Sequence, residues 1–309
     1  MADTINPLSA GEGRVRGHSL VKLGGDIYED GEETMPDLRV PPERLCQYGP
    51  YRDETRRIAM FSVANDFEAH GYPMPPQTDS LLAQNWCHSI TRKVGASFVA
   101  HIPYSTDSVG EAARNWSPNY LPFEEFYEKL KDFVAWHLER LSFEPTKIAI
   151  IVGHGGNREL PEHEKELGER FGLPVSCLMA GASEPLIYPE FEAIDVLYEI
   201  VTKGGEHAYI LEYSLIAHMG HLDYDKLATV NEVASKDPLE ALRRWPAIAG
   251  LGGYIEFGGP EFNPLREIEG LKIALEDFKN RRKILVDPEL GRRANEIIVN
   301  HFCERLQAG

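Results

Sequence analysis

The sequence has few cysteines, no long apolar run and too few basic residues to balance its acidic ones. Its four cysteines lie far apart and form no C-x-x-C pair, which argues against a zinc ribbon or a dense disulfide framework. We therefore expect free thiols and a cytoplasmic protein. No run approaches the roughly 18 apolar residues of a transmembrane helix, and the first residues lack the apolar segment of a secretory signal.

The charge balance argues against nucleic acid and membrane as partners. The chain has 32 basic and 49 acidic residues, a net charge of −17. Binding to a phosphate backbone needs clustered Lys and Arg, and an anionic membrane would repel this surface. A neutral or cationic small molecule remains compatible with this charge.

The chain divides into two parts by composition. Residues 1–56 are rich in glycine, proline and acidic residues and show little periodicity, so we expect an N-terminal arm. Residues 57–309 have the length and apolar content of one domain. An elaboration at about 219–283 contains GLGGYIEFGGPEFNP, which is too rich in glycine to predict a helix, and then a helix over 267–279.

Apolar runs and amphipathic segments alternate along this domain. Strands are predicted at residues 58–64, 96–104, 147–152 and 173–179. Helices are predicted at residues 79–93, 123–141 and 161–171, with a last one opening at 287–288. This order predicts an α/β fold, a three-layer α/β/α sandwich with a mostly parallel central sheet.

Polar side chains follow the first predicted strand, where ligands bind in parallel α/β sheets. Glu68 and His70 are two residues apart, so on an extended segment both side chains face one cavity. Asp79 opens the next helix, and a carboxylate can bridge two ions such as Zn²⁺ or Mn²⁺. Alone the signal is weak, because about one Glu-x-His is expected by chance among eleven histidines.

Two further segments contain candidate functional histidines. His154 lies among three glycines in Gly153–Asn157, directly after an apolar strand, and a histidine with so little around it favours metal or substrate binding over a structural turn. His207 and Glu212 flank an apolar stretch. On its own, that last segment is more simply a helix start with one buried histidine.

Together the three segments resemble the creatininase (creatinine amidohydrolase) family. The family pattern E-x-H-G-x-H-x-P-x-x-T-D is matched by Glu68–Gly71, Pro75 and Thr78-Asp79. Its N-G-H-G-G-N is matched by Gly153–Asn157, and its H-A-G-E-x-E-T-S by His207, Ala208, Glu212 and Ser214. The resemblance covers about residues 57–218 and the last helix, which indicates a divergent subgroup.

The resemblance implies one or two divalent ions per subunit (Zn, Mn or Fe) and a homo-oligomer. Glu68 and His154 would hold one ion, His70 the other, and Asp79 would bridge them. Some members supply a carboxylate for the second ion at the position of Gly156, which has no side chain. Glu212 would take over that role, or the second ion would bind loosely.

The resemblance also implies a hydrolase that uses metal-activated water, with His207 and Glu212 as catalytic residues. The substrate would be a small cyclic amide or a related molecule with a C–N bond. Creatinine itself is disfavoured, because Lys203-Gly204 stand where creatinine-cleaving members have Trp-Asp. Asn157, Asp107 and Tyr209 are candidate substrate-binding residues.

Three alternatives stay open. One is hydrolysis of a C–C bond in a cyclic diketone such as a dehydro-inosose, as some relatives appear to perform. Another is a non-catalytic metal-binding scaffold, although a pure binder would not need His207. The last is a serine hydrolase, which is disfavoured because Gly181–Pro185 lacks the final glycine of G-x-S-x-G.

Overall fold

The computed structural model describes residues 57–180 and 191–308. The expected arm at residues 1–56 and the serine segment Gly181–Pro185 lie outside the described residues. The domain boundary at residue 57 therefore stays a prediction.

Four parallel strands form the central sheet in the order β2-β1-β3-β4. The strands are β1 (Ile58–Val63), β2 (Ala96–Ile102), β3 (Lys147–Val152) and β4 (Val175–Met179). The chain moves from β1 to β2 on one side and then returns to β3 on the other. This reversal places a crevice between β1 and β3 at their carboxyl ends, the usual location of a ligand in such sheets.

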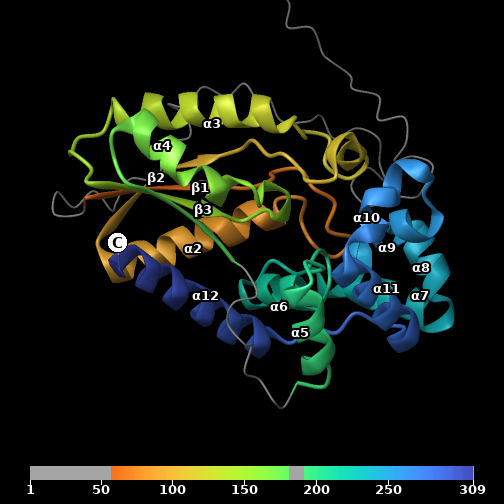
Figure 1. Ribbon diagram of the computed structural model, residues 1–309. Coiled ribbons are helices and arrows are strands. Elements are labelled where there is room, and N and C mark those ends of the chain that lie inside the picture. The colour runs from red at the N-terminus through yellow and green to blue at the C-terminus, as the bar shows by residue number, and fades with distance from the viewer. Residues whose placement is uncertain (1–56, 181–190, 309) are drawn as a thin grey trace, which may run out of the picture.

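Helices cover both faces of the sheet (Figure 1). On β1, Phe61 and Val63 pack with the first helical layer, while Met60 points into the opposite cluster. The first layer contains α3 (Phe123–Leu138) and α4 (Glu164–Phe171); the second contains α2 (Thr78–Val94) and α12 (Pro288–Ala308). The structure thus confirms the predicted three-layer α/β/α architecture with a parallel sheet.

The remaining helices lie mainly toward one end of the sheet, where α7 to α11 form a group (Figure 1). They are α5 (Ile194–Thr202), α6 (Ile210–His218), α7 (Tyr224–Lys236), α8 (Pro238–Arg244), α9 (Ile248–Phe257), α10 (Asn263–Glu267) and α11 (Glu269–Arg281). Short 3-10 turns are η2 (Gly110–Asn115), η3 (Gly155–Asn157), η4 (Leu160–His163) and η5 (Pro260–Phe262). Helix α6, which contains Glu212, packs against α12.

One local prediction was wrong: the glycine-rich segment does contain a helix, α9. Its first turn is irregular, since Ala249, Gly250 and Leu251 have φ of 53°, 65° and 61°. The later glycines are buried against neighbouring elements, and a Cβ at Gly252 would lie 2.9 Å from Leu242 Cδ2. Close packing therefore overrides the low helix propensity of glycine here.

Two expectations from composition can be compared with the described residues. Cys87, Cys177 and Cys303 are free and buried, as predicted, and Cys46 lies outside the described residues. Across residues 57–180 and 191–308, none of the helices has the length and apolarity that crossing a membrane requires.

Candidate metal centre

The predicted metal ligands meet at the carboxyl edge of the sheet. Glu68 and His70 lie on the loop after β1, and His154 directly follows β3. Since β1 and β3 are neighbours, these loops converge although 84 residues separate His70 from His154. Asp79 joins them from the first turn of α2.

One group contains Glu68, Asp79 and His154, all buried. His154 Nδ1 lies 2.8 Å from Asp79 Oδ2 and 2.9 Å from Glu68 Oε2. Glu68 Oε2 makes no hydrogen bond, although it is buried. Two carboxylate oxygens therefore crowd one ring nitrogen, an arrangement that a cation between them would stabilise.

A second group contains His70, Asp79 and Glu212. His70 Nε2 lies 3.0 Å from Asp79 Oδ1 and 3.8 Å from Glu212 Oε2. Asp79 is thus shared, with one carboxylate oxygen toward each histidine. This is the donor arrangement of a carboxylate that bridges two divalent ions.

Gly156 leaves no room for the carboxylate that some family members carry at its position. A Cβ there would lie 2.5 Å from the Thr106 carbonyl oxygen and 2.8 Å from Asp107 Cα, and closer still to His154 Nε2. Glu212 instead brings an acidic side chain beside His70, with its Oε2 held by the Ala208 backbone N–H at 2.6 Å.

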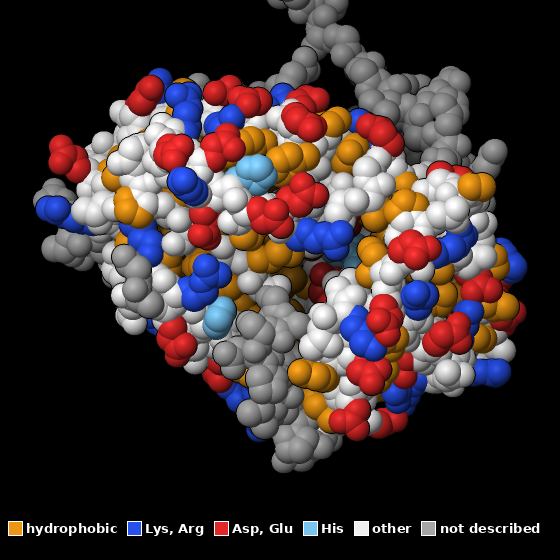
Figure 2. All heavy atoms as spheres, in the orientation of Figure 1, with side chains coloured by type: hydrophobic (Ala, Val, Ile, Leu, Met, Phe, Trp, Pro, Cys, Tyr) orange, Lys and Arg blue, Asp and Glu red, His pale blue; other side chains and the backbone are white. Residues whose placement is uncertain are grey.

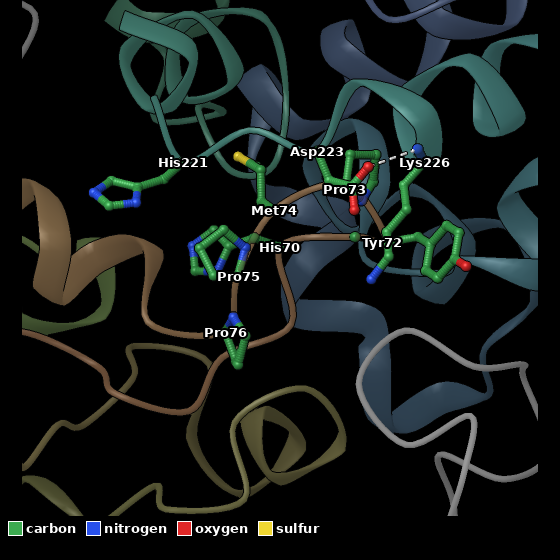
Figure 3. A pocket seen from close by; sticks show the side chains of 10 residues that line it. His70, Tyr72, Pro73, Met74, Pro75, Pro76, His221, Asp223 and Lys226 are labelled. Atoms are coloured by element: carbon green, nitrogen blue, oxygen red, sulfur yellow. Dashed lines mark hydrogen bonds between the residues drawn. The ribbon is translucent and has the colours of Figure 1, made fainter. Parts of the chain in front are cut away.

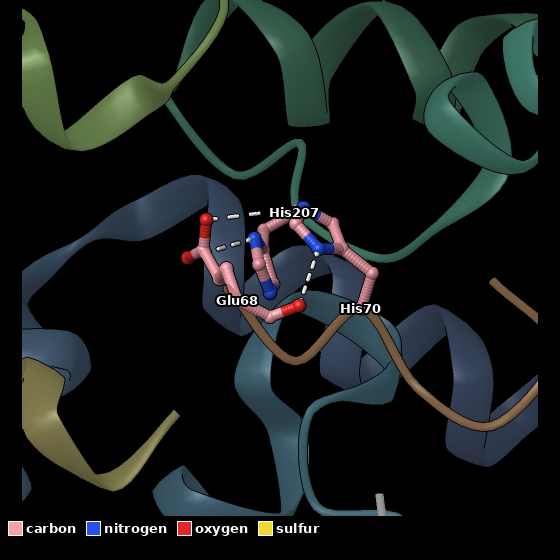
Figure 4. Close-up of side chains that lie close together, drawn as sticks. All are labelled: Glu68, His70 and His207. Atoms are coloured by element: carbon pink, nitrogen blue, oxygen red, sulfur yellow. Dashed lines mark hydrogen bonds and ion pairs between the residues drawn. The ribbon is translucent and has the colours of Figure 1, made fainter. Parts of the chain in front are cut away.

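His207 lies beside the same cluster (Figure 4). Its Nδ1 is 3.6 Å from Glu68 Oε1, and its ring centroid is 4.5 Å from that of His70. Glu68, His70 and His207 form a third group of closely spaced donor atoms.

Each of the three histidines is oriented by a backbone carbonyl. His70 Nδ1 lies 3.0 Å from Glu68 O, His154 Nε2 3.0 Å from Thr106 O, and His207 Nε2 2.9 Å from Ala69 O. A carbonyl only accepts hydrogen bonds, so in a neutral ring the proton lies on these nitrogens and the other nitrogen presents its lone pair to the carboxylates. Metal-binding histidines are oriented in this way, and the residues present therefore fit divalent ions.

Burial and mutual charge shift the pKa values of the cluster. Burial raises the pKa of Glu68 to about 8 against the pull of His154. For His70, burial opposes protonation, but the carboxylates of Asp79 and Glu212 outweigh it and raise the pKa to about 10. Burial and the charge of His70 lower the pKa of His207 to about 3, so its ring is neutral at pH 7.

A cavity of about 290 Å³ adjoins the cluster. Asp79, His154, His207 and Glu212 all line it, together with the predicted substrate residue Asp107. Burial raises the pKa of the Asp107 carboxyl. A substrate in this cavity would contact the candidate ligands directly.

Two other predicted substrate residues are not among those that line this cavity. Asn157 is fully buried, and its Oδ1 accepts a hydrogen bond from the Thr106 backbone N–H at 3.0 Å. Tyr209 is also fully buried, and its hydroxyl donates to Asp277 at 2.8 Å.

Sequence reasoning gave no role to Glu206, which lines the cavity. Its Oε1 accepts hydrogen bonds from the backbone N–H groups of Leu211 and Glu212 at 2.7 and 3.0 Å, at the start of α6. Burial and the charge of Glu212 raise its pKa to about 8. A carboxylate just before a helix was the available signal, since acidic groups stabilise helix N-termini.

A second cavity of about 290 Å³ lies beside the loop that carries His70 (Figure 3). His70 also lines this cavity, together with the proline-rich turn of Pro73, Pro75 and Pro76. His221 is exposed there and belongs to none of the closely spaced donor groups found in the described part of the chain. It therefore provides a control position for the histidines of the cluster.

A serine, a histidine and an aspartate are joined by hydrogen bonds at the carboxyl ends of β1 and β2. Ser62 Oγ is 2.8 Å from His101 Nδ1, and His101 Nε2 is 2.9 Å from Asp66 Oδ1. The Ser62 side chain is fully buried on β1, so no substrate reaches its oxygen. These three side chains resemble a nucleophilic triad only in their residue types. Their hydrogen bonds connect β1 and β2 to the loop that carries Glu68 and His70.

Comparison with solved structures identifies the fold of the chain, whereas two comparisons of its sequence find no match. No model of a known family and no curated protein sequence matches the chain. A crystal structure of creatinine amidohydrolase (creatininase) superposes with a TM-score of 0.51 and 17% identity, covering 82% of this chain and 92% of that one. The chain has a creatininase-like fold. A putative creatinine amidohydrolase from Bacteroides fragilis is also similar, with a TM-score of 0.46 and 15% identity over 80% of this chain and 87% of that one.

The creatininase-like fold agrees with the fold that the sequence motifs implied. At 17% identity the similarity concerns architecture. The similarity alone therefore assigns no activity to this chain.

Proposed function

We propose that the chain is a metal-dependent hydrolase that opens a small cyclic substrate at an amide or related C–N bond. The observation that carries this proposal is the shared carboxylate. Asp79 presents one oxygen to His154 and the other to His70, while backbone carbonyls hold the outer nitrogen of each ring. A pair of divalent ions such as Zn²⁺, Mn²⁺ or Fe²⁺ suits this set of oxygen and imidazole donors.

We assign the residues as follows. Glu68 and His154 would hold one ion, His70 and Glu212 the other, and Asp79 both. Divalent ions in such a site lower the pKa of water and polarise carbonyl groups. His207 keeps its Nε2 proton on the Ala69 carbonyl, so Nδ1 is the atom that accepts a proton and returns it to the leaving group.

Two other functions are separated from this one by simple measurements. A C–C hydrolase acting on a cyclic diketone would use the same residues but release no amine or amide nitrogen. A metal-binding scaffold would bind ions without turnover. A cytoplasmic location and a homo-oligomeric state are further proposals, and light scattering after size exclusion tests the second.

The experiment is a hydrolysis screen of cyclic amides, formamides and cyclic diketones with Zn²⁺, Mn²⁺ and Fe²⁺. We expect ring opening of a cyclic amide with at least one ion, and its loss in His207→Ala with bound metal retained. His221→Ala, which changes an exposed histidine outside the cluster, keeps full turnover. Ring opening of diketones alone would favour C–C hydrolysis, and no ring opening with any ion would overturn the hydrolase proposal.

A further inference from the structure

The cavity beside the metal cluster has two chemically different parts. Asp79, His154, His207 and Glu212 belong to the cluster, and more than half of all the residues that line the cavity are apolar. On the face drawn in Figure 2, hydrophobic side chains lie beside a central hollow, which also has basic and acidic side chains at its edge. The reacting end of a substrate would therefore lie against charged groups while the rest of it meets hydrocarbon.

Several of the apolar side chains remain partly exposed. They come from five separate parts of the fold: the turn before η2, the end of β4, α5, the junction of α10 and α11, and α12. The half-buried members are Val109, Met179, Ala180, Val201, Ile268, Ile297 and Ile298. An apolar ligand that covered these side chains would remove hydrocarbon surface from water, which is the main favourable contribution to binding in such pockets.

Uncharged hydrogen-bonding side chains are few in the lining, which contains Ser108 and the indoles of Trp86 and Trp116. Outside the cluster, the ionisable side chains of Asp107, Arg158 and Glu206 also line the cavity. Asn157 is fully buried and does not line the cavity, and its Oδ1 accepts a hydrogen bond from the Thr106 backbone N–H. Asn85 does not line it either, and its amide donates to Asn295 at 3.0 Å. Since more than half of the lining residues are apolar, a ring with many hydroxyl groups would lose more hydrogen bonds to water than these few groups can replace.

We propose that the cavity beside the metal cluster, called the chamber below, selects substrates whose hydrolysed group carries a compact alkyl or aryl substituent. We also propose that it disfavours polyhydroxylated rings. The inference rests on the proposed hydrolase function and adds the class of substrate to it. Continuity with the cluster supports this occupant, because one cavity contains both the candidate ligands and the apolar wall.

The test uses hydroxamates, whose head group binds divalent ions and whose tail can be varied. Calorimetry measures the binding of acetohydroxamate, hexanohydroxamate and gluconohydroxamate to the Zn²⁺-loaded full chain. A fully buried methylene improves binding about fourfold (about 0.8 kcal/mol), so the four added methylenes of hexanohydroxamate should give at least a tenfold gain over acetohydroxamate. Gluconohydroxamate should gain nothing.

Two matched variants locate the effect. Ile268→Asn places an amide in the chamber wall, while Ile273→Asn changes another half-buried isoleucine of the same region that does not line the cavity. The first should lose several-fold in affinity for hexanohydroxamate and keep its affinity for acetohydroxamate; the second should keep both. Acetohydroxamate binding with no gain from the alkyl tail, or an equal gain from the polyol tail, would overturn the chamber proposal alone. If no hydroxamate bound at all, the metal site itself would be refuted, and the chamber proposal with it.

Discussion

Replacing Gly156 by alanine should weaken metal binding, while the same change at the neighbouring Gly155 should not. A Cβ at Gly156 would lie 2.5 Å from the Thr106 carbonyl oxygen and 2.8 Å from Asp107 Cα, and both are backbone atoms. Relief to normal contact needs a shift of about 1 Å. The hydrogen bond of 3.0 Å that orients His154 on the Thr106 carbonyl lies in the same place. A Cβ at Gly155 meets nothing within 4 Å.

Overpacking of this kind costs about 1–3 kcal/mol. If this cost reduces the free energy of metal binding, the affinity falls between about fivefold and 150-fold, since 1.4 kcal/mol is a factor of ten. Competition with a chromophoric chelator measures the affinity for Zn²⁺. We expect Gly156→Ala to bind at least about fivefold more weakly than the wild type and Gly155→Ala to bind within about twofold of it. Both variants lose the backbone entropy of a glycine in the unfolded chain, so their comparison cancels that effect. Equal affinities in the two variants would show that close contacts of a Cβ at Gly156 do not disturb the metal site.

Three further predictions follow from the same geometry. Binding of Zn²⁺ at pH 7 should release about three protons, because three of the assigned ligands must lose a proton to coordinate: His70, with a pKa of about 10, His154, whose pKa is also raised, and Glu68, with a pKa of about 8. Calorimetry in buffers of different ionisation enthalpy measures this number, and no release would contradict it. The metal-free protein should lose thermal stability between about pH 6.5 and pH 10: the pKa of His70 is raised on folding, so its stabilising contribution is complete below the unfolded value of 6.5 and is lost as the pH rises through about 10. Metal-loaded protein should not show this loss, and a thermal unfolding midpoint of the metal-free protein that rises over this pH range would contradict the expectation. Gly291→Ala should lower the free energy of unfolding in urea by about 1–3 kcal/mol or more, because its Cβ would meet the Ser214 carbonyl and lie 2.8 Å from Leu215 N where α12 crosses α6; a change below 0.5 kcal/mol would contradict this.

The sequence predicted the layers of the fold well because buried parallel strands are continuous apolar runs. Strand β3 has the predicted bounds, Lys147–Val152. Helix α3 ends at Leu138 rather than at residue 141, which is the usual uncertainty of helix ends. The glycine-rich helix α9 was missed because burial against α8 and α11, and not local propensity, stabilises it.

Residue patterns alone indicated the residue types of the candidate site, whereas the pairing of Glu68 with His154 and of His70 with Glu212 was expected only from the family resemblance. Glu68 and His154 are 86 positions apart, and only the order of the strands brings their side chains to 2.9 Å. That Glu212 lies beside His70, and that Tyr209 bonds to Asp277 away from the cavity, depends on the packing of α6. Such contacts between distant elements leave no periodic signal in the sequence.

Electron paramagnetic resonance of the Mn²⁺-loaded chain shows whether Asp79 bridges two ions. Two ions joined by one carboxylate interact magnetically, so their spectrum differs from the six-line signal of an isolated Mn²⁺. We expect two bound ions per chain with a coupled spectrum, and loss of the coupling in Asp79→Asn. A single isolated ion, or two uncoupled ions in the wild type, would contradict the account.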